Sequence, residues 1–192
     1  MKFNLLVGIY TDSCATRNAE ISESFRRNTE NKYIEKIHVF NENLERKTYL
    51  NFFQFANEKL SGSVVILANN DIYFDDTPGL LVEGDLDGKL LCITRRDGGN
   101  LHPCPYHSQD AWIFKAPLKD FPCDWQLGRM RCDNKLVYEA RKAGLKVFNP
   151  CLDIHIHHLH ASRKRNYSIS EVLPGEVDTV NACGLEEMRK SA

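Results

Sequence analysis

The sequence lacks both glycine-rich motifs that commonly hold the phosphates of a nucleotide. Neither GxGxxG nor GxxxxGK[ST] follows any of its apolar runs, which excludes the dinucleotide fingerprint and the P-loop. It also lacks CxxC pairs, and its seven cysteines are odd in number and scattered. We therefore expect no disulfide framework and no zinc ribbon, and we expect a reducing, cytoplasmic setting. If the protein binds phosphate, a divalent cation is the obvious substitute for the missing loops.

Long apolar runs and strong net charge are also missing. No stretch approaches the roughly 18 apolar residues that a membrane-spanning helix needs. The apolar start of the chain is short, is interrupted by Asn4 and Gly8, and has no small-residue cleavage site after it. The formal net charge of -1 gives no global basic field for nucleic acid. We expect neither a transmembrane segment nor a nucleic-acid partner.

The first half of the chain alternates strand-like and helix-like segments. Strands are expected at Phe3–Tyr10, Lys36–Phe40 and Val64–Ala68, and helices from a cap at Thr11 or Ser13 to about Asn28 and over Glu45–Leu60. This alternation builds a parallel sheet with right-handed crossovers. With 192 residues and 42% hydrophobic content, the chain fits one domain. The predicted fold class is α/β, with a central, mostly parallel sheet flanked by helices.

Polar side chains follow the expected strand Val64–Ala68 directly. The run Val-Val-Ile-Leu-Ala has no polar alternation, which is typical of a strand buried on both faces. Asn69, Asp71, Asp75 and Asp76 then lie at its carboxyl end, where open α/β sheets bind ligands. Their oxygens suit Mg²⁺ or Mn²⁺ shared with substrate phosphates. The alternative is an ordinary turn, because Asn and Asp are frequent in turns.

Other candidate site residues lie near later segment ends. Arg95 and Arg96 follow an expected strand, and guanidinium groups match phosphate oxygens bidentately; a solvated turn is the alternative, favoured for Arg96. Asp110 precedes another expected strand that ends at Lys115. Asp133 opens an expected helix, where the helix dipole favours an acid, so capping and catalysis can coexist there.

Four of the seven histidines fall between positions 155 and 160. In an extended chain His158 and His160 point to one side and His157 to the other, so the first two form a candidate metal or phosphate site. A basic run from Arg163 to Arg165 follows, and the alternative is a surface patch for an anionic partner. From Ile169 onward the pattern weakens, and we expect a tail that is loosely packed or used for interactions.

As an ordered set, these stretches resemble glycosyltransferase-family-2-like enzymes of the GT-A fold, which occur in bacteria and large DNA viruses. The matching stretches are Ala68–Asp75, Ile93-Thr94-Arg95, Ser108–Phe114, Leu127-Gly128 with Cys132-Asp133-Asn134, Asn149-Pro150, and His158–Ser162 with Arg165 and Tyr167. The resemblance implies a GT-A-like nucleotide-sugar-binding catalytic domain over residues 1–167, with residues 168–192 as a C-terminal tail. For a viral protein, the expected location is the host cytoplasm.

The resemblance also implies a reaction, a cofactor and partners. A sugar would pass from a nucleotide-diphosphate sugar, with a UDP-sugar favoured, to a hydroxyl of a glycan or glycoprotein acceptor. In GT-A enzymes Mn²⁺ or Mg²⁺ on a DxD motif holds the donor diphosphate. The matching triplet here is Asn69-Asn70-Asp71, in which an amide replaces the first acid. The late histidine that many of these enzymes add to the metal matches His158 or His160.

The remaining matches give roles to individual side chains. Asp133 would take the acceptor's proton if the enzyme inverts, with Asp110 as its substitute or as a ligand for sugar hydroxyls. The candidate nucleotide-sugar-binding residues are Thr11, Arg17, Glu42, Asn69, Asn70 and Arg95, with Arg95 on the phosphates and Thr11, Arg17 and Glu42 on the base and ribose. The sequence leaves retention or inversion of the sugar's configuration open.

Two other functions were weighed. A sugar-1-phosphate nucleotidyltransferase is disfavoured, because the first strand lacks the Gly-rich, Lys/Arg-bearing loop of such enzymes. A non-enzymatic metal- or anion-binding module would use the His155–Arg165 segment, with the acidic strand end as a mere turn. That module predicts zinc binding that survives loss of Asp71, and no sugar transfer.

Overall fold

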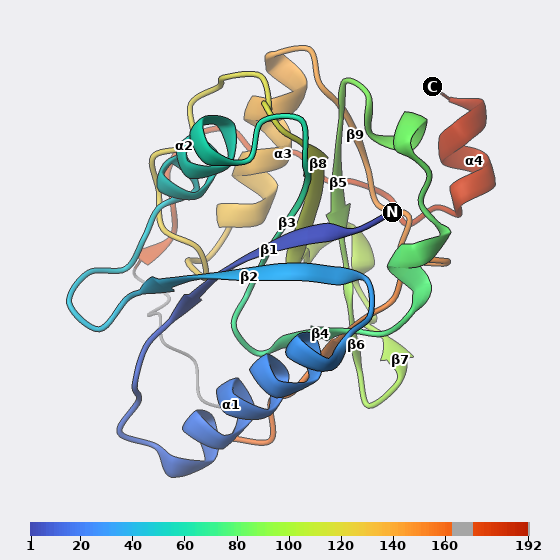
Figure 1. Ribbon diagram of the computed structural model, residues 1–192. Coiled ribbons are helices and arrows are strands. Elements are labelled where there is room, and N and C mark those ends of the chain that lie inside the picture. The colour runs from blue at the N-terminus through green and yellow to red at the C-terminus, as the bar shows by residue number, and fades with distance from the viewer. Residues whose placement is uncertain (163–170, 192) are drawn as a thin grey trace.

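The computed structural model describes residues 1–162 and 171–191, which form two sheets and the helices around them (Figure 1). The larger sheet has the strand order β2-β1-β3-β8-β5-β9, and the smaller has β4-β10-β6-β7. The strands of the larger sheet are β1 Phe3–Ile9, β2 Ile34–Asn41, β3 Val64–Ala68, β5 Lys89–Ile93, β8 Ala111–Lys115 and β9 Lys146–Phe148. Those of the smaller sheet are β4 Ile72–Phe74, β6 Arg95–Asp97, β7 Asn100–Leu101 and β10 Ile156–His158. The helices are α1 Ala15–Glu30, α2 Tyr49–Lys59, α3 Cys132–Lys142 and α4 Leu185–Lys190, with short 3₁₀ turns at Thr77–Leu80, Glu83–Leu86 and Pro105–His107.

The larger sheet is mostly parallel, which confirms the predicted α/β class. Strand β1 pairs in parallel with β2 and β3, and β5 pairs in parallel with β9. Only β8 runs the other way, between β3 and β5. Its first residue, Ala111, therefore stands opposite the last residues of its neighbours, Ala68 and Ile93. This register brings the residues that follow β3 and β5 together with those that precede β8.

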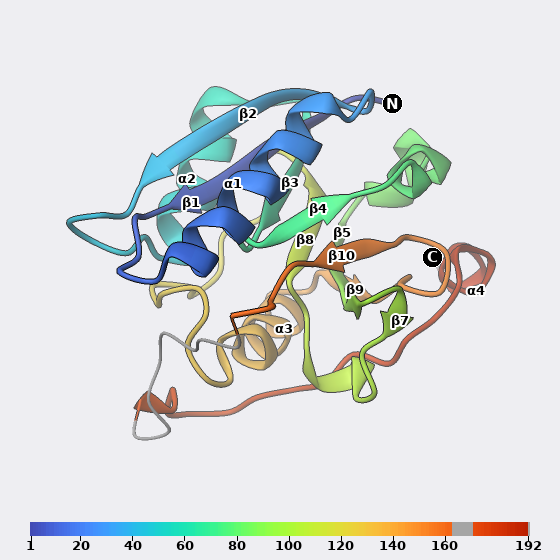
Figure 2. The ribbon, with the colours of Figure 1, turned by 90° about the horizontal axis from the view of Figure 1, so that it is seen from below.

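Alternating side chains of the strands build one core on each face of the larger sheet. Val65 and Leu67 of β3 join a cluster with helices α2 and α3, whereas Ile66 joins a cluster with Ile72 and Ile156 of the smaller sheet. Helix α1 packs against β4 and β2 (Figure 2). The sheet is thus covered by α2 and α3 on one face and by the smaller sheet on the other.

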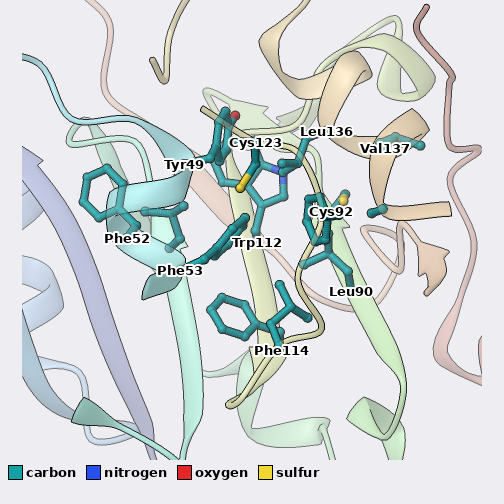
Figure 3. Close-up of a cluster of buried hydrophobic side chains, with 14 of the residues drawn as sticks. Tyr49, Phe52, Phe53, Leu90, Cys92, Trp112, Phe114, Cys123, Leu136 and Val137 are labelled. Carbon is teal, nitrogen blue, oxygen red and sulfur yellow. The ribbon is translucent and has the colours of Figure 1, made fainter. Parts of the chain in front are cut away.

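The aromatic residues of α2 belong to the core, as predicted. Tyr49, Phe52 and Phe53 are buried, and the Tyr49 ring meets Trp112 of β8 edge-on with centroids 4.9 Å apart (Figure 3). The helix begins at Tyr49 rather than at the predicted Glu45. Thr48 caps it, because its hydroxyl accepts the Asn51 backbone N–H while the Asn51 side chain accepts the N–H of Thr48.

Neither side chain predicted to cap α1 does so. The helix begins at Ala15 after Cys14, and it has no side-chain cap from Thr11 or Ser13. The Asp12 carboxylate instead accepts the backbone N–H of Cys14 at 2.7 Å, which fixes the turn before the helix.

The expectation of a loosely packed tail is wrong for residues 171–191. Leu173 and Val180 are buried in the cluster of α2 and α3, and Cys183, Leu185 and Met188 in the opposite one. These apolar residues are too widely spaced for periodicity to reveal them. The assignment of residues 1–167 to a catalytic domain stays a prediction. No helix within the described ranges is both long and apolar enough to cross a membrane.

Candidate active site

A cavity of about 510 Å³ opens where β1, β3 and β5 end and β8 begins, a size typical of small-molecule sites. It is lined by nearly all the predicted site residues: Arg17, Glu42, Asn69, Asn70, Asp71, Arg95, Asp110, Asp133, His158 and His160. Thr11 is the exception. It is exposed, and its backbone N–H is bound to Asn43, so the structure does not bring it into the cavity.

Asp71, His158 and His160, here called the inner triad, meet at one end of this cavity. Strand β10 runs antiparallel to β4, which places His158 opposite Ile72 and beside Asp71. His158 Nε2 lies 3.0 Å from Asp71 Oδ2, and His160 Nδ1 lies 4.0 Å from the same oxygen. Potential ligand atoms of all three residues lie within 4.8 Å of one another.

Buried charges stabilise Asp71 as a carboxylate. Its Oδ2 accepts a 2.7 Å hydrogen bond from Arg17 Nη1, and Glu20 binds the same guanidinium nitrogen at 3.2 Å. Burial alone would raise the pKa of Asp71, but hydrogen bonds and charges from His158 and Arg17 lower it well below its usual value. Burial likewise opposes protonation of His158, yet Asp71 raises its pKa overall.

His160 has the opposite character. Its ring stacks on His158 with centroids 4.9 Å apart. Burial and then the neighbouring His158 lower the pKa of His160, which favours the neutral ring. Its buried Nδ1 has no hydrogen-bond partner among the described residues, so it is available as a ligand atom.

The inner triad fits a divalent cation by three criteria. The 3.0 Å between Asp71 Oδ2 and His158 Nε2 matches the spacing of neighbouring ligands in an octahedral site with bonds of about 2.1 Å. Asp97 Oδ1 binds the other ring nitrogen of His158 at 2.8 Å, the usual way in which a carboxylate orients a metal-binding histidine. His160 adds a neutral nitrogen. Two imidazoles favour Mn²⁺ over Mg²⁺, which prefers oxygen.

Asn69 and Asn70, the first two residues of the predicted metal triplet, form hydrogen bonds with other parts of the site. Asn69 Nδ2 donates to Asp110 Oδ1 at 3.0 Å. Asn70 Nδ2 donates to the carbonyl of Gly8, and its Oδ1 accepts from Arg17 at 3.1 Å. In this arrangement Asp71 alone of the triplet faces the two histidines.

Asp110 and Arg95, which both line the cavity, form an ion pair with each other. Arg95 Nη1 lies 3.0 Å from Asp110 Oδ2 and 2.9 Å from the hydroxyl of Ser108. Because Asn69 occupies the other carboxylate oxygen, both oxygens of Asp110 are engaged. Asp110 therefore holds Arg95 and Asn69 in place on the cavity wall.

Asp133 is the carboxylate best suited to proton transfer. It lies in the first turn of α3, as predicted, and its oxygens accept the backbone N–H groups of Gln109 at 3.1 Å and Asn134 at 3.0 Å. Burial, with a further contribution from the charge of Asp110, raises the pKa of Asp133 to about 6. A carboxyl group with that pKa can gain and lose a proton near neutral pH.

Asp75, His155 and His157, here called the outer triad, lie outside this cavity. His157 Nε2 is 3.0 Å and His155 Nδ1 is 3.6 Å from Asp75 Oδ2. Within the described ranges, only the inner triad brings three potential metal-binding atoms of His, Cys, Asp or Glu within 4.8 Å. The basic run 163–165 and Tyr167 lie outside the described residues.

Sequence reasoning missed part of the cavity. Arg46, Arg129 and Arg131 line it, as do Gln109, Trp112 and Asn134, each with a buried polar atom that lacks a partner in the described structure. Only the fold brings the loop before α3 against the loop before α2. One signal was present in the sequence: two arginines just before a helix start are electrostatically unfavourable, because that end carries positive charge.

Comparisons with known proteins give one structural match to report. No protein-family model matches the chain, and no curated protein matches it. A similar solved structure is that of a glycosyltransferase involved in the glycosylation of the major capsid of PBCV-1. It is 15% identical, with a TM-score of 0.47 over 85% of this chain and 96% of that chain.

Proposed function

We propose that the protein is a metal-dependent glycosyltransferase of the GT-A type, related to glycosyltransferase family 2. It moves a sugar from a nucleotide-diphosphate sugar, with a UDP-sugar favoured, to a hydroxyl of a glycan or glycoprotein. The observation that carries the proposal is the meeting of Asp71 with His158 and His160 in a cavity that also holds Asp133 and Arg95.

The donor diphosphate belongs at the end of the cavity that holds the inner triad. A cation bound there would stabilise the negative charge that develops on the leaving nucleoside diphosphate. Arg95 adds a guanidinium that can exchange Asp110 for a phosphate oxygen. Arg17 is bound to Asp71, Glu20 and Asn70, so its role is to neutralise the base of this site rather than to contact a ribose.

Glu42 keeps its proposed role toward the nucleoside. Its carboxyl group packs over β1, where a Cβ on Gly8 would lie 2.3 Å from the Glu42 carboxyl carbon. Glycine at position 8 is thus required for this approach. Burial raises the pKa of Glu42, although the Lys47 backbone N–H binds one oxygen. A half-buried carboxyl that lines the cavity can bind base or ribose donors.

Asp133 supplies the general base if the enzyme inverts. The two backbone N–H groups on its oxygens fix the orientation of the carboxylate. Its pKa near 6 leaves it charged at neutral pH but basic enough to take a hydroxyl proton as the sugar transfers. We choose Asp133 over Asp110 because burial raises the pKa of Asp133 to about 6, whereas Asp110 holds the Arg95 guanidinium in an ion pair.

The alternative of a non-enzymatic binding module fits the geometry less well. It needs the His155–Arg165 segment to act as one patch. The described part of that segment is instead divided, with His155 and His157 on Asp75 and His158 and His160 on Asp71. The module would also leave Asp133 without a purpose in the same cavity.

A thermal-shift screen tests the proposal. We expect a UDP-sugar together with Mn²⁺ to raise the melting temperature by roughly 5–10 °C at about 100 times the dissociation constant. The same UDP-sugar with a chelator should raise it far less, and GDP and ADP with Mn²⁺ serve as matched nucleotides. If no nucleotide or nucleotide sugar stabilises the protein with any divalent cation, the proposal is wrong. Zinc binding that persists in Asp71→Ala would then favour the binding module.

A further inference from the structure

Arginines gather on the part of the cavity wall that belongs to helices α2 and α3. Arg46 precedes α2, and Arg129 and Arg131 precede α3. The two loops are adjacent, since Arg46 Nη1 lies 3.8 Å from where a Cβ of Gly128 would be. The inner triad belongs instead to the ends of β3 and β10. The cavity therefore has a second cationic region, which we call the arginine wall.

Few carboxylates balance the charge of the arginine wall, although the charge of Arg46 acts on the Glu42 carboxyl in the same cavity. Within the described ranges, no carboxylate oxygen lies within 4.0 Å of the Arg46 or Arg131 guanidinium; Arg131 donates only to the carbonyls of Leu173 and Gly175. Among the described residues, the only carboxylate within 4.0 Å of the Arg129 guanidinium is that of Glu171, at 3.9 Å. By contrast, Arg17 and Arg95 on the other wall each hold a cavity carboxylate at 3.0 Å or less. The unbalanced charge indicates an anionic ligand.

The start of α3 supports the same conclusion with a separate observation. Asn134, in the first turn of this 11-residue helix, is 7% exposed and lines the cavity, yet its Nδ2 has no acceptor in the described structure. Trp112 Nε1 nearby also lacks an acceptor. The N-cap is Arg131, without a side-chain cap, so a cation stands at the positive end of the helix dipole. Hydrogen-bond donors and positive charge therefore gather at the start of α3.

The position of this wall identifies which substrate it would bind. Asp133 lies in the same first turn of α3, and an acceptor hydroxyl must approach Asp133 to lose its proton. The diphosphate of the donor has its own cationic partners around Asp71 and Arg95. We infer that the acceptor is an acidic sugar, whose carboxylate, sulfate or phosphate group binds Arg46, Arg129 and the Asn134 amide. The role of this acidic sugar as the acceptor rests on the proposed function.

Calorimetric titration of small sugars tests the inference. The intact protein, saturated with UDP and Mn²⁺, is titrated with D-glucuronate, D-glucose 6-phosphate and neutral D-glucose. We expect at least one acidic sugar to bind about tenfold or more tightly than glucose, because a charge-assisted arginine contact contributes about 1.5 kcal/mol or more. Arg46→Gln and Arg129→Gln should each remove most of that preference. Arg26→Gln is the matched control, since Arg26 pairs with Glu23 and Glu30 on the exposed face of α1.

The outcomes separate this inference from the proposed function. Equal binding of acidic and neutral sugars, or a preference that survives the double variant Arg46→Gln/Arg129→Gln with an unchanged melting temperature, overturns it. Inorganic phosphate binding as tightly as the acidic sugars also overturns it, because the wall would then recognise a free anion. UDP binding is titrated on its own. If UDP does not bind, and GDP and ADP do not bind in the thermal-shift screen, an intact arginine-dependent preference for acidic sugars removes the proposed function and leaves an acidic-sugar site.

Discussion

The molecule contains two sets of one aspartate and two histidines, one at each end of the short strand β4. The inner triad is Asp71, His158 and His160, and the outer triad is Asp75, His155 and His157. The Asp71 side chain is 9% exposed and that of Asp75 is 34% exposed. In the inner triad a neutral, partnerless nitrogen and an oriented imidazole face one buried carboxylate oxygen.

The outer triad has the same composition, but its side chains are occupied by other contacts. His157 stacks on Tyr73 at 4.9 Å, His155 Nε2 lies 3.2 Å from the carbonyl of Leu152, and Asp75 holds Thr77. The comparison teaches that residue type does not define a candidate metal site. A candidate metal site is defined by buried side chains that converge on one point and by an atom among them that has no partner.

The largest expected effect comes from the carboxylate that shares the cavity with the inner triad. Asp133→Asn should lower kcat by about 10²- to 10⁴-fold, because the amide cannot take the acceptor's proton. Asp75→Asn, the matched change in the outer triad, should leave kcat nearly unchanged. Steady-state transfer from a UDP-sugar measures both. Equal losses in the two variants would erase the distinction between the regions.

The pH dependence of transfer should report the same carboxylate. Because the pKa of Asp133 is raised to about 6, the protonated, inactive form accumulates below that pH. The value of kcat should then fall about tenfold per pH unit below 6 and level off above it. Cation binding must displace the proton of His158, so UDP and Mn²⁺ affinities are measured at each pH and kcat is taken at saturation. A flat profile from pH 5 to 8 would remove Asp133 as the base.

The smallest of these effects concerns single histidines. His160→Ala should weaken Mn²⁺ binding by about tenfold or more, since even residues that only orient a ligand contribute that much. His155→Ala should leave Mn²⁺ affinity unchanged, because His155 lies in the outer triad. Electron paramagnetic resonance of free Mn²⁺ gives both constants. A larger loss of Mn²⁺ affinity in His155→Ala than in His160→Ala would reverse the assignment of the two triads.

Strand patterns allowed much of this arrangement to be predicted. The unbroken run Val64–Ala68 forms a buried strand, as predicted, and the opposite facing of His157 and His158 follows from the extended backbone of β10. Asp71 and His158 are 87 residues apart, and only the resemblance to an enzyme family linked them. Their contact depends on the antiparallel pairing of β10 with β4, which no local pattern encodes.

Other features depend on tertiary contacts that local sequence does not specify. Arg17 was assigned to a ribose, but it forms an ion pair with Asp71, because α1 lies beside β4. The packing of residues 171–191 depends on widely spaced apolar side chains that find both cores. The arginine wall exists because two loops distant in sequence meet. Thr11 is the opposite of the arginine wall: its position after β1 makes it a candidate, but it is exposed outside the cavity.

The most direct test of a cation held between Asp71 and the late histidines is calorimetry of UDP-sugar binding. The titration is done with and without Mn²⁺, in Asp71→Ala and in Asp75→Ala. We predict that Asp71→Ala abolishes the cation-dependent part of the affinity while Asp75→Ala keeps it. Both variants should first be shown to melt as folded proteins. Cation-dependent binding that is unchanged in folded Asp71→Ala would contradict the account.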